Sequence, residues 1–300
     1  MRVILAIDGS EGARGAQDMV LVLPLPRSLL VTVVTVLDVP QARFTSLTPM
    51  ARRAYHGALA AMRREAEDAA HKVLGAAREA MEGRGVRVTT RIKEGPAAAA
   101  IIQAADLRAA DLVVVGSHGL GPVKEFLLGS VSQKVARYAP CFVLIVKRAP
   151  GKVRRVLLGV DGSCHAEAAL KFLAGLPLPS DATVHICAVA QLPTFLPPNA
   201  GRSREPRATA LRTIAKVVGA AAVRVLAEAR ALLARNEYAV TASLRVGHAA
   251  GHLLAGIREF RPDLVVIGAK GRTAVKWFAL GSVAQKVVKY APCSVLVVRP

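Results

Sequence analysis

The 300-residue sequence is poor in cysteine, in aromatic side chains and in long apolar runs, and each shortage excludes a class of protein. The cysteines Cys141, Cys164, Cys187 and Cys293 form no CxxC pair, so we expect buried free thiols in strands rather than disulfides or a metal site. Aromatic residues make up only 4%, which argues against a nucleic-acid surface with stacked bases. No run approaches the roughly 20 apolar residues that cross a bilayer.

Acidic residues are also scarce, with 21 Asp and Glu against 41 Lys and Arg, for a formal charge of +20. The basic residues are scattered along predicted helical faces. This pattern favours a solvated surface that attracts anions over specific nucleic-acid binding. The opening MRVILAIDGS enters a strand-like run and reaches Asp8 without the longer apolar region of a signal peptide. We therefore expect a cytoplasmic protein with no membrane segment.

The sequence contains an internal duplication. VILAIDGS at 3–10 matches VLLGVDGS at 156–163, a shift of 153 residues. EGPAAAAI at 94–101 lies opposite VGHAAGHL at 246–253, a shift of 152, and the segments ADLVVVGSHG and GSVSQKVARYAPCFVLIV repeat with that same shift. Two copies of one domain are therefore predicted, at 1–148 and 152–300, with Pro150 and Gly151 marking the junction.

Within each copy, short apolar runs alternate with helical patterns. In the first copy we predict strands at 2–8 and 29–37, in VRVTTRI, in DLVVVG and in CFVLIV, with helices between them, including a long helix at 50–82. Nearly all-apolar strands separated by helices indicate a parallel sheet covered on both faces. The predicted fold is therefore α/β, with two tandem doubly wound parallel five-stranded sheets.

A spacing of glycines follows the fourth predicted strand of each copy. In the first copy Gly116 ends that strand, Gly119 lies in the next loop, and Gly129 and Ser130 open the next helix. Glycine permits close approach to the backbone, and a helix start attracts anions, so the pattern could bind phosphate. The alternative is that these glycines only shape tight turns. Neither GxxxxGK[ST] nor GxGxxG is present in either copy.

The complete pattern, Gly-x-x-Gly, nine residues and Gly-Ser, resembles the nucleotide signature of the universal stress protein family. It occurs twice, as Gly116, Gly119, Gly129 and Ser130 and as Gly268, Gly271, Gly281 and Ser282. The VILAIDGS opening and the APC segment before the last strand also resemble that family, and the resemblance covers nearly all of both copies. It implies an adenine nucleotide alpha hydrolase-like fold and a site for ATP, with or without magnesium, in each domain.

The resemblance also implies roles for individual residues. An aspartate after the first strand would contact the nucleoside, and a valine near the end of the second strand would contact adenine through its backbone. The glycines and serine would hold the phosphates, helped by the valine after the serine. The further residues in these positions are Asp8, Val36 and Val131 in the first copy and Asp161, Val189 and Val283 in the second. From the residues alone, Asp8 could instead cap the first helix with Ser10.

Charged residues near the glycines are less specific signals. Lys270 and Arg272 flank Gly271 and could neutralise phosphate, although loop cations are common in solvent. His118 has no carboxylate partner visible in the sequence, and its counterpart is Lys270, so we do not expect a catalytic base. His248 and His252 are four residues apart on a predicted helix, a spacing that can bind metal, but no third ligand is apparent.

Together, these expectations predict a stress-response protein in which an adenine nucleotide acts as a regulatory or assembly signal. The alternatives are an interaction protein that does not use one or both sites, a slow ATPase and a nucleic-acid binder resting on net charge alone. The last strands, CFVLIVKR and CSVLVVRP, would lie at sheet edges. We expect them to pair within one chain as a pseudo-dimer, and assembly of two chains stays open.

Overall fold

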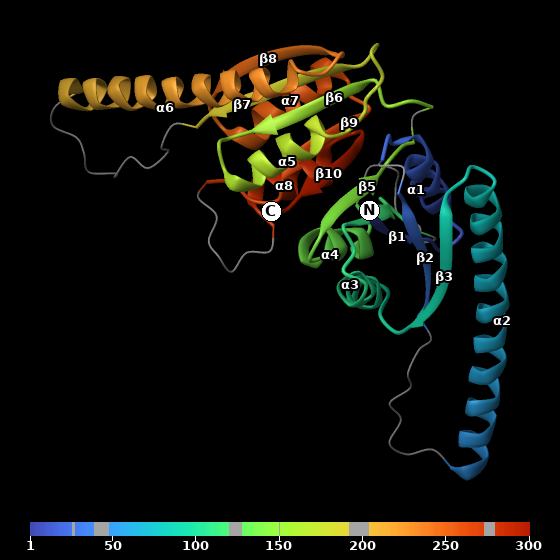
Figure 1. The fold of residues 1–300 in the computed structure, drawn as a ribbon. Coiled ribbons are helices and arrows are strands. Elements are labelled where there is room, and N and C mark those ends of the chain that lie inside the picture. The colour runs from blue at the N-terminus through green and yellow to red at the C-terminus, as the bar shows by residue number, and fades with distance from the viewer. Residues whose placement is uncertain (26–27, 39–47, 120–127, 150, 192–203, 273–279) are drawn as a thin grey trace. The chain divides into compact units, whose positions relative to one another are not determined.

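The computed structural model divides the chain into two compact units, Met1–Ala149 and Pro150–Pro300. Both units have the same order of helices and strands, so the duplication in sequence corresponds to a duplicated fold (Figure 1). The structure describes residues 1–25, 28–38, 48–119, 128–149, 151–191, 204–272 and 280–300.

The first unit contains a parallel sheet in the order β3-β2-β1-β4-β5. The chain moves outward from β1 to β3 and then crosses back to β4 and β5, so the winding reverses between β1 and β4. Ligands of such sheets bind beyond the carboxyl ends of the strands at this reversal. The elements are β1 (Arg2–Ala6), α1 (Glu11–Val22), β2 (Leu30–Leu37), α2 (Pro49–Glu82), β3 (Arg87–Glu94), α3 (Ala97–Leu107), β4 (Leu112–Gly116), α4 (Ser130–Tyr138) and β5 (Phe142–Val146).

The second unit repeats this topology in the order β8-β7-β6-β9-β10, again with every pair parallel. The reversal of winding here falls between β6 and β9. The elements are β6 (Arg155–Val160), α5 (Cys164–Ala174), β7 (Thr183–Ala190), α6 (Arg204–Leu233), β8 (Ala239–Val246), α7 (Ala249–Phe260), β9 (Leu264–Gly268), α8 (Ser282–Tyr290) and β10 (Ser294–Val298).

Helices cover both faces of each sheet. In the first unit α1 and α2 lie on one face, whereas α3 and α4 contact each other on the opposite face (Figure 1). In the second unit α5 contacts α6 on one face and α7 contacts α8 on the other. The predicted fold of two doubly wound parallel five-stranded sheets is therefore confirmed.

Burial of β-branched residues explains why the central strands form. Leu112–Val115 of β4 and Leu264–Ile267 of β9 are buried from end to end. Each fully buried Val, Leu or Ile side chain stabilises the fold by about 1.5–3 kcal/mol relative to an exposed one. The outer strands β3 and β8 have only exposed and half-buried residues, as expected of strands that helices cover less completely.

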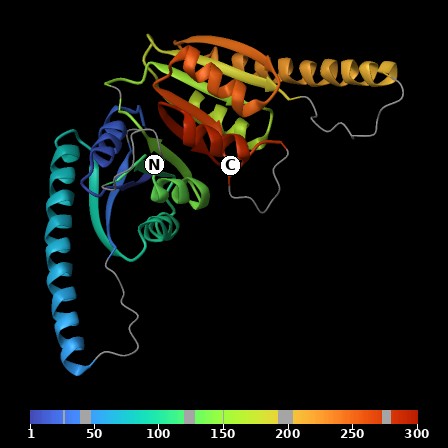
Figure 2. The ribbon, with the colours of Figure 1, turned by 180° about the vertical axis from the view of Figure 1, so that it is seen from behind.

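The buried residues found in the two longest helices lie in their second halves. In α2 the buried residues Leu74 and Met81 lie in the later turns, whereas Met50 is 84% exposed. In α6 Leu233 is buried and Val217 is 64% exposed. Both helices extend beyond the strands they contact, as Figure 2 shows from behind. The first half of α2 thus contributes little to the core of its unit, and in α6 none of the residues 213–228 is buried.

The expectation of four buried thiols in strands is wrong for Cys164. Cys164 is exposed because it is the first residue of α5, directly after Ser163, which caps that helix. Cys187 is buried within β7, and the buried residues Cys141 and Cys293 immediately precede β5 and β10. None of the helices in the described part of the chain combines the length and apolar character that a membrane span needs.

Candidate functional site

The predicted site residues of each unit gather where the winding of the sheet reverses. β1 and β4 are adjacent, so the segment that follows β1 and the loop that follows β4 emerge side by side. Asp8 lies in the first of these segments and Gly119 in the second. Asp161 and Gly271 occupy the same places after the adjacent strands β6 and β9.

The aspartate of each unit contacts its glycine loop, which we define as residues 116–130 in the first unit and 268–282 in the second. A Cβ atom added to Gly119 would collide with Asp8 Oδ2, and one added to Gly271 would lie 2.8 Å from Asp161 Oδ2. A side chain at either position would have to displace the carboxylate, so glycine lets the aspartate approach the backbone. In the second unit the backbone N–H of Arg272 donates a hydrogen bond to Asp161 Oδ2, 3.3 Å away.

The other carboxylate oxygen stabilises the start of the following segment. Asp8 Oδ1 accepts a hydrogen bond from the backbone N–H of Ser10, and Asp161 Oδ1 accepts one from that of Ser163, both at 3.0 Å. The local capping role that we considered for Asp8 is thus present, with Ser10 as the N-cap residue of α1. This hydrogen bond uses Oδ1 of the aspartate, and Oδ2 is directed at the glycine loop.

A backbone hydrogen bond closes each glycine loop. The N–H of Gly129 donates to the carbonyl oxygen of Ser117 at 2.7 Å, and the N–H of Gly281 donates to that of Ala269 at 2.8 Å. A Cβ atom at Gly129 would lie 3.1 Å from the Ser117 oxygen, closer than most side chains tolerate. These bonds hold the first turn of α4 or α8 beside the end of the preceding strand.

The helices that follow the glycine loops begin without a side-chain cap. Gly129 and Gly281 are the N-cap residues of α4 and α8, and neither helix has a side-chain cap hydrogen bond. Ser130 is the first helical residue of α4, and Ser282 is the first of α8. Uncapped first-turn N–H groups and the partial positive charge of a helix start favour an anion.

Gly116 and Gly268 are needed for packing. A Cβ atom at Gly116 would lie 2.6 Å from backbone atoms of Gly12 in α1, and one at Gly268 would lie 2.7 Å from the backbone of Ala166 in α5. A side chain at either position would push the helix off the strand end. Their glycine identity therefore follows from helix packing, independently of any ligand.

The predicted adenine-contacting valines lie at equivalent places near the ends of β2 and β7. Val36 and Val189 are each the penultimate residue of their strand, and each is half-buried. The N–H of Ile7 donates to the carbonyl oxygen of Val34 at 2.9 Å, so the segment that leads to Asp8 continues beside β2. Each valine is thus on the strand next to the aspartate of its unit.

The side chains of the two glycine loops differ. In the first unit Ser117 Oγ and His118 Nδ1 form a hydrogen bond of 2.9 Å. In the second unit Lys270 is half-buried, Arg272 is exposed, and Ser163 Oγ donates to the carbonyl oxygen of Lys270 at 3.2 Å. Lys124 and Lys276, which also belong to these loops, lie outside the described residues.

His165, which the sequence analysis did not single out, lies beside Gly268 at the start of the second glycine loop. A Cβ atom at Gly268 would approach within 2.8 Å of His165 Cβ. Burial lowers the pKa of His165, and the positive charge of Lys270 lowers it further. The equivalent residue in the first copy is Gly12. Because one copy has glycine and the other histidine, the repeat pattern offers no signal that would identify this position.

The first residue of the histidine pair, His248, caps the start of α7. His248 is the N-cap residue, and its Nδ1 accepts a hydrogen bond from the backbone N–H of Gly251 at 3.3 Å. Within the described ranges, no group of three or more His, Cys, Asp or Glu side chains is arranged to hold a metal ion.

The model of the universal stress protein family matches residues 1–147 and again residues 152–299. The chain therefore belongs to the universal stress protein family and carries the domain of that family twice in tandem. Universal stress protein YxiE of Bacillus subtilis is 32% identical over 146 residues, which are 49% of this chain and 98% of that protein. Universal stress protein Slr1230 of Synechocystis is 25% identical over 191 residues, 63% of this chain and 58% of that protein.

Two solved structures that align over nearly all of this chain share its fold. A universal stress protein from Archaeoglobus fulgidus is 20% identical and has a TM-score of 0.62, over 99% of this chain and 98% of that one. A protein from Pseudomonas aeruginosa, described as a putative universal stress protein, is 16% identical with a TM-score of 0.58, over 100% of this chain and 93% of that one.

Proposed function

We propose that each unit binds ATP or a related adenine nucleotide, and that the nucleotide acts as a regulatory or assembly signal in a stress response. One observation carries the proposal. In both units a carboxylate and an uncapped helix start meet at the carboxyl ends of adjacent strands, held together by glycines whose spacing is the same. Asp8 with Gly119 and Asp161 with Gly271 form this arrangement.

The two kinds of group suit the two ends of a nucleotide. A carboxylate accepts hydrogen bonds from ribose hydroxyl groups, so Asp8 and Asp161 would hold the nucleoside. First-turn N–H groups donate to phosphate oxygens, so the starts of α4 and α8 would hold the phosphates. The backbone at Val36 and Val189 would meet the adenine. Magnesium, when present, would reduce the charge of the phosphates.

Binding by backbone groups explains why a signalling role is proposed. The groups that would contact the phosphates are N–H groups of Gly129 to Val131 and of Gly281 to Val283, together with the cations Lys270 and Arg272 in the second unit. Such groups stabilise a bound polyphosphate without activating a nucleophile. The nucleotide would therefore shift the stability or association of the protein on binding.

Isothermal titration calorimetry of the full chain with ATP, in the presence and absence of magnesium, tests the proposal. We expect two sites in the wild type. Gly119→Ala and Gly271→Ala should each weaken one site by about tenfold, because the new methyl group displaces the carboxylate and one charge-assisted hydrogen bond is lost. The double variant should lose both sites.

Gly151→Ala is the matched control, because a Cβ atom there meets nothing within 4 Å. It should bind ATP like the wild type. The proposal is wrong if the wild type shows no saturable binding at millimolar ATP, or if the two loop variants bind as tightly as the Gly151→Ala variant. Thermal unfolding of each variant shows that any loss comes from the site rather than from the fold.

A further inference from the structure

The first unit has a further concave surface, apart from its glycine loop. A cleft of about 460 Å³ opens on the face of the sheet that α3 covers. Val3, Ile4 and Thr32 of the sheet and Ala104 of α3 contribute to its walls. Its cationic residues are Arg2, Arg91, Lys93 and Arg108, and its more exposed apolar residues are Leu30 and Leu107.

All the charged residues that line the cleft are basic. None of its lining residues is acidic. Among the described residues, no ion pair involves Arg91, Lys93 or Arg108. The nearby carboxylate of Asp111 accepts a hydrogen bond from the backbone N–H of Arg2, and the Arg2 side chain donates to the carbonyl oxygen of Arg108 at 3.3 Å. The four cations therefore lack a carboxylate partner within the cleft.

Apolar side chains lie beside these cations. Leu107 is 70% exposed and Leu30 is 40% exposed, although both are large apolar residues. Exposed leucines that line a concave surface mark a binding site more often than leucines scattered singly. The volume is within the range of about 300–1,000 Å³ that is usual for small-molecule sites. The cleft thus offers an apolar wall with positive charge around it.

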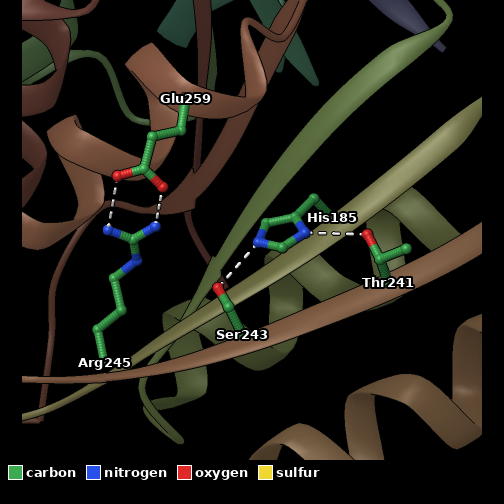
Figure 3. A network of polar contacts seen from close by, with 5 residues as sticks. All are labelled: His185, Thr241, Ser243, Arg245 and Glu259. Atoms are coloured by element: carbon green, nitrogen blue, oxygen red, sulfur yellow. Dashed lines mark hydrogen bonds and ion pairs between the residues drawn. The ribbon is translucent and has the colours of Figure 1, made fainter.

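The equivalent place in the second unit is occupied by side chains. Thr32 corresponds to His185, and the ring nitrogens of His185 form hydrogen bonds of 2.9 Å with Thr241 Oγ1 and 2.8 Å with Ser243 Oγ (Figure 3). Phe260, which corresponds to Arg108, stacks against the His185 ring with the centroids 5.1 Å apart.

The cations of the second unit are also engaged. Arg245, the counterpart of Lys93, forms an ion pair with Glu259, which replaces Leu107 (Figure 3). The guanidinium group of Arg155, the counterpart of Arg2, lies 4.5 Å from the centroid of the Phe260 ring. In the second unit His185, Glu259 and Phe260 thus occupy this place, and the first unit has the smaller or basic residues Thr32, Leu107 and Arg108 at the same positions.

We propose that this cleft of the first unit binds an amphipathic small-molecule anion, with an apolar body and a carboxylate, sulfonate or phosphate group. The apolar body lies against Leu30 and Leu107. The anionic group accepts hydrogen bonds from Arg91, Lys93 and Arg108. The site is separate from the proposed nucleotide site, whose residues follow the carboxyl ends of β1 and β4.

Titration of the full chain with 8-anilinonaphthalene-1-sulfonate, followed by fluorescence, tests this proposal. We expect saturable binding that persists when ATP is present in excess. Arg91→Glu should weaken binding about tenfold, because a charge-assisted contact becomes a repulsion. Arg87→Glu is the matched control, since it makes the same charge change on β3 outside the cleft, and it should weaken binding no more than about twofold after screening by salt.

A second variant transfers the closing residues of the other unit. Leu107→Glu with Arg108→Phe should abolish binding, because the new glutamate can pair with Lys93 and the phenyl ring fills the cleft. Far-UV circular dichroism and the thermal midpoint show whether each variant is folded. The proposal is overturned if the wild type shows no saturable binding, if ATP displaces the probe, if Arg91→Glu and Arg87→Glu have equal effects, or if the folded double variant still binds.

Discussion

The described ends of the two glycine loops share backbone contacts and differ in their side chains. Both have the closing hydrogen bond, the uncapped helix start and the aspartate contact. The first unit places His118 where the second places Lys270, and the second adds Arg272. The comparison shows that the backbone geometry depends on glycine, whereas the charge around it can change without altering that geometry.

The contacts that stabilise the two loops also differ. In the first unit Ser132 Oγ donates to the carbonyl oxygen of Gly116 at 2.6 Å, and the second unit has Ala284 at that position. In the second unit Asp161 is half-buried and accepts from Arg272, whereas Asp8 is exposed. The described ends of the two loops are therefore held by different side-chain hydrogen bonds in the two copies.

The largest effect should come from the glycines that the two units share for packing. Gly116→Ala and Gly268→Ala should each lower the free energy of unfolding by about 1–3 kcal/mol, because the methyl group would collide with the backbone of α1 or α5. Urea unfolding measures this change.

Gly219→Ala in α6 is the control, because a Cβ atom there meets nothing within 4 Å. It should raise the free energy of unfolding by about 0.5–1 kcal/mol, since alanine favours a helix more than glycine does. Equal stability of Gly116→Ala and the wild type would show that α1 can move away from β4, and the packing argument would be wrong.

A smaller effect should separate the two loops by their charge. In a Gly119→Ala background, which weakens the first site, Lys270→His should lower the ATP affinity of the second site about fivefold at low salt, because a cation near the phosphates is lost. The difference should shrink as salt is added. Calorimetry at two salt concentrations measures it.

Lys152→His makes the same substitution outside the loop and should leave ATP affinity unchanged. If Lys270→His also leaves it unchanged at low salt, Lys270 does not face the phosphates. His118→Lys should then be tested in a Gly271→Ala background, in which the second site is weakened. The ATP affinity of the first site should increase if a cation at this loop position acts alike in both units.

Much of the fold could be predicted because it depends on local patterns. An apolar run predicted a strand at 29–37 and an amphipathic segment rich in Ala, Arg and Glu predicted a helix at 50–82. The structure has Leu30–Leu37 and Pro49–Glu82. The duplication repeated every element, which supported each assignment twice. The aspartate and the glycines could be named from the family pattern, and the structure places them together in each unit.

The remaining features could not be predicted because they depend on contacts between distant segments. Gly116 appeared as part of a ligand loop, and only its approach to Gly12 shows why glycine is needed there. The cleft brings together Arg2, Lys93 and Leu107, which come from three different elements. No spacing in the sequence relates such residues, since their proximity follows from strand order and helix packing.

The smallest expected effect is a loss of stability in acid. Two histidines of the second unit, His165 and His185, should contribute to it. Burial lowers the pKa of His165, with a further contribution from Lys270, and burial lowers the pKa of His185, with a further contribution from Arg245. Both folded values lie below the ordinary value of 6.5. Between the folded and ordinary values the unfolded state binds more protons, so the free energy of unfolding falls as pH decreases below 6.5 and is unaffected above it.

Thermal unfolding of the full chain between pH 5 and pH 8 tests this expectation. His165→Gln should make the midpoint less dependent on pH below 6.5, because one group that resists protonation in the folded state is removed. His56→Gln, on the exposed part of α2, makes the same substitution in the first unit and is the control for the substitution itself. A His165→Gln variant that loses stability in acid as steeply as the wild type would show that His165 titrates alike in both states, and the contrast between the two units would then rest on His185 alone.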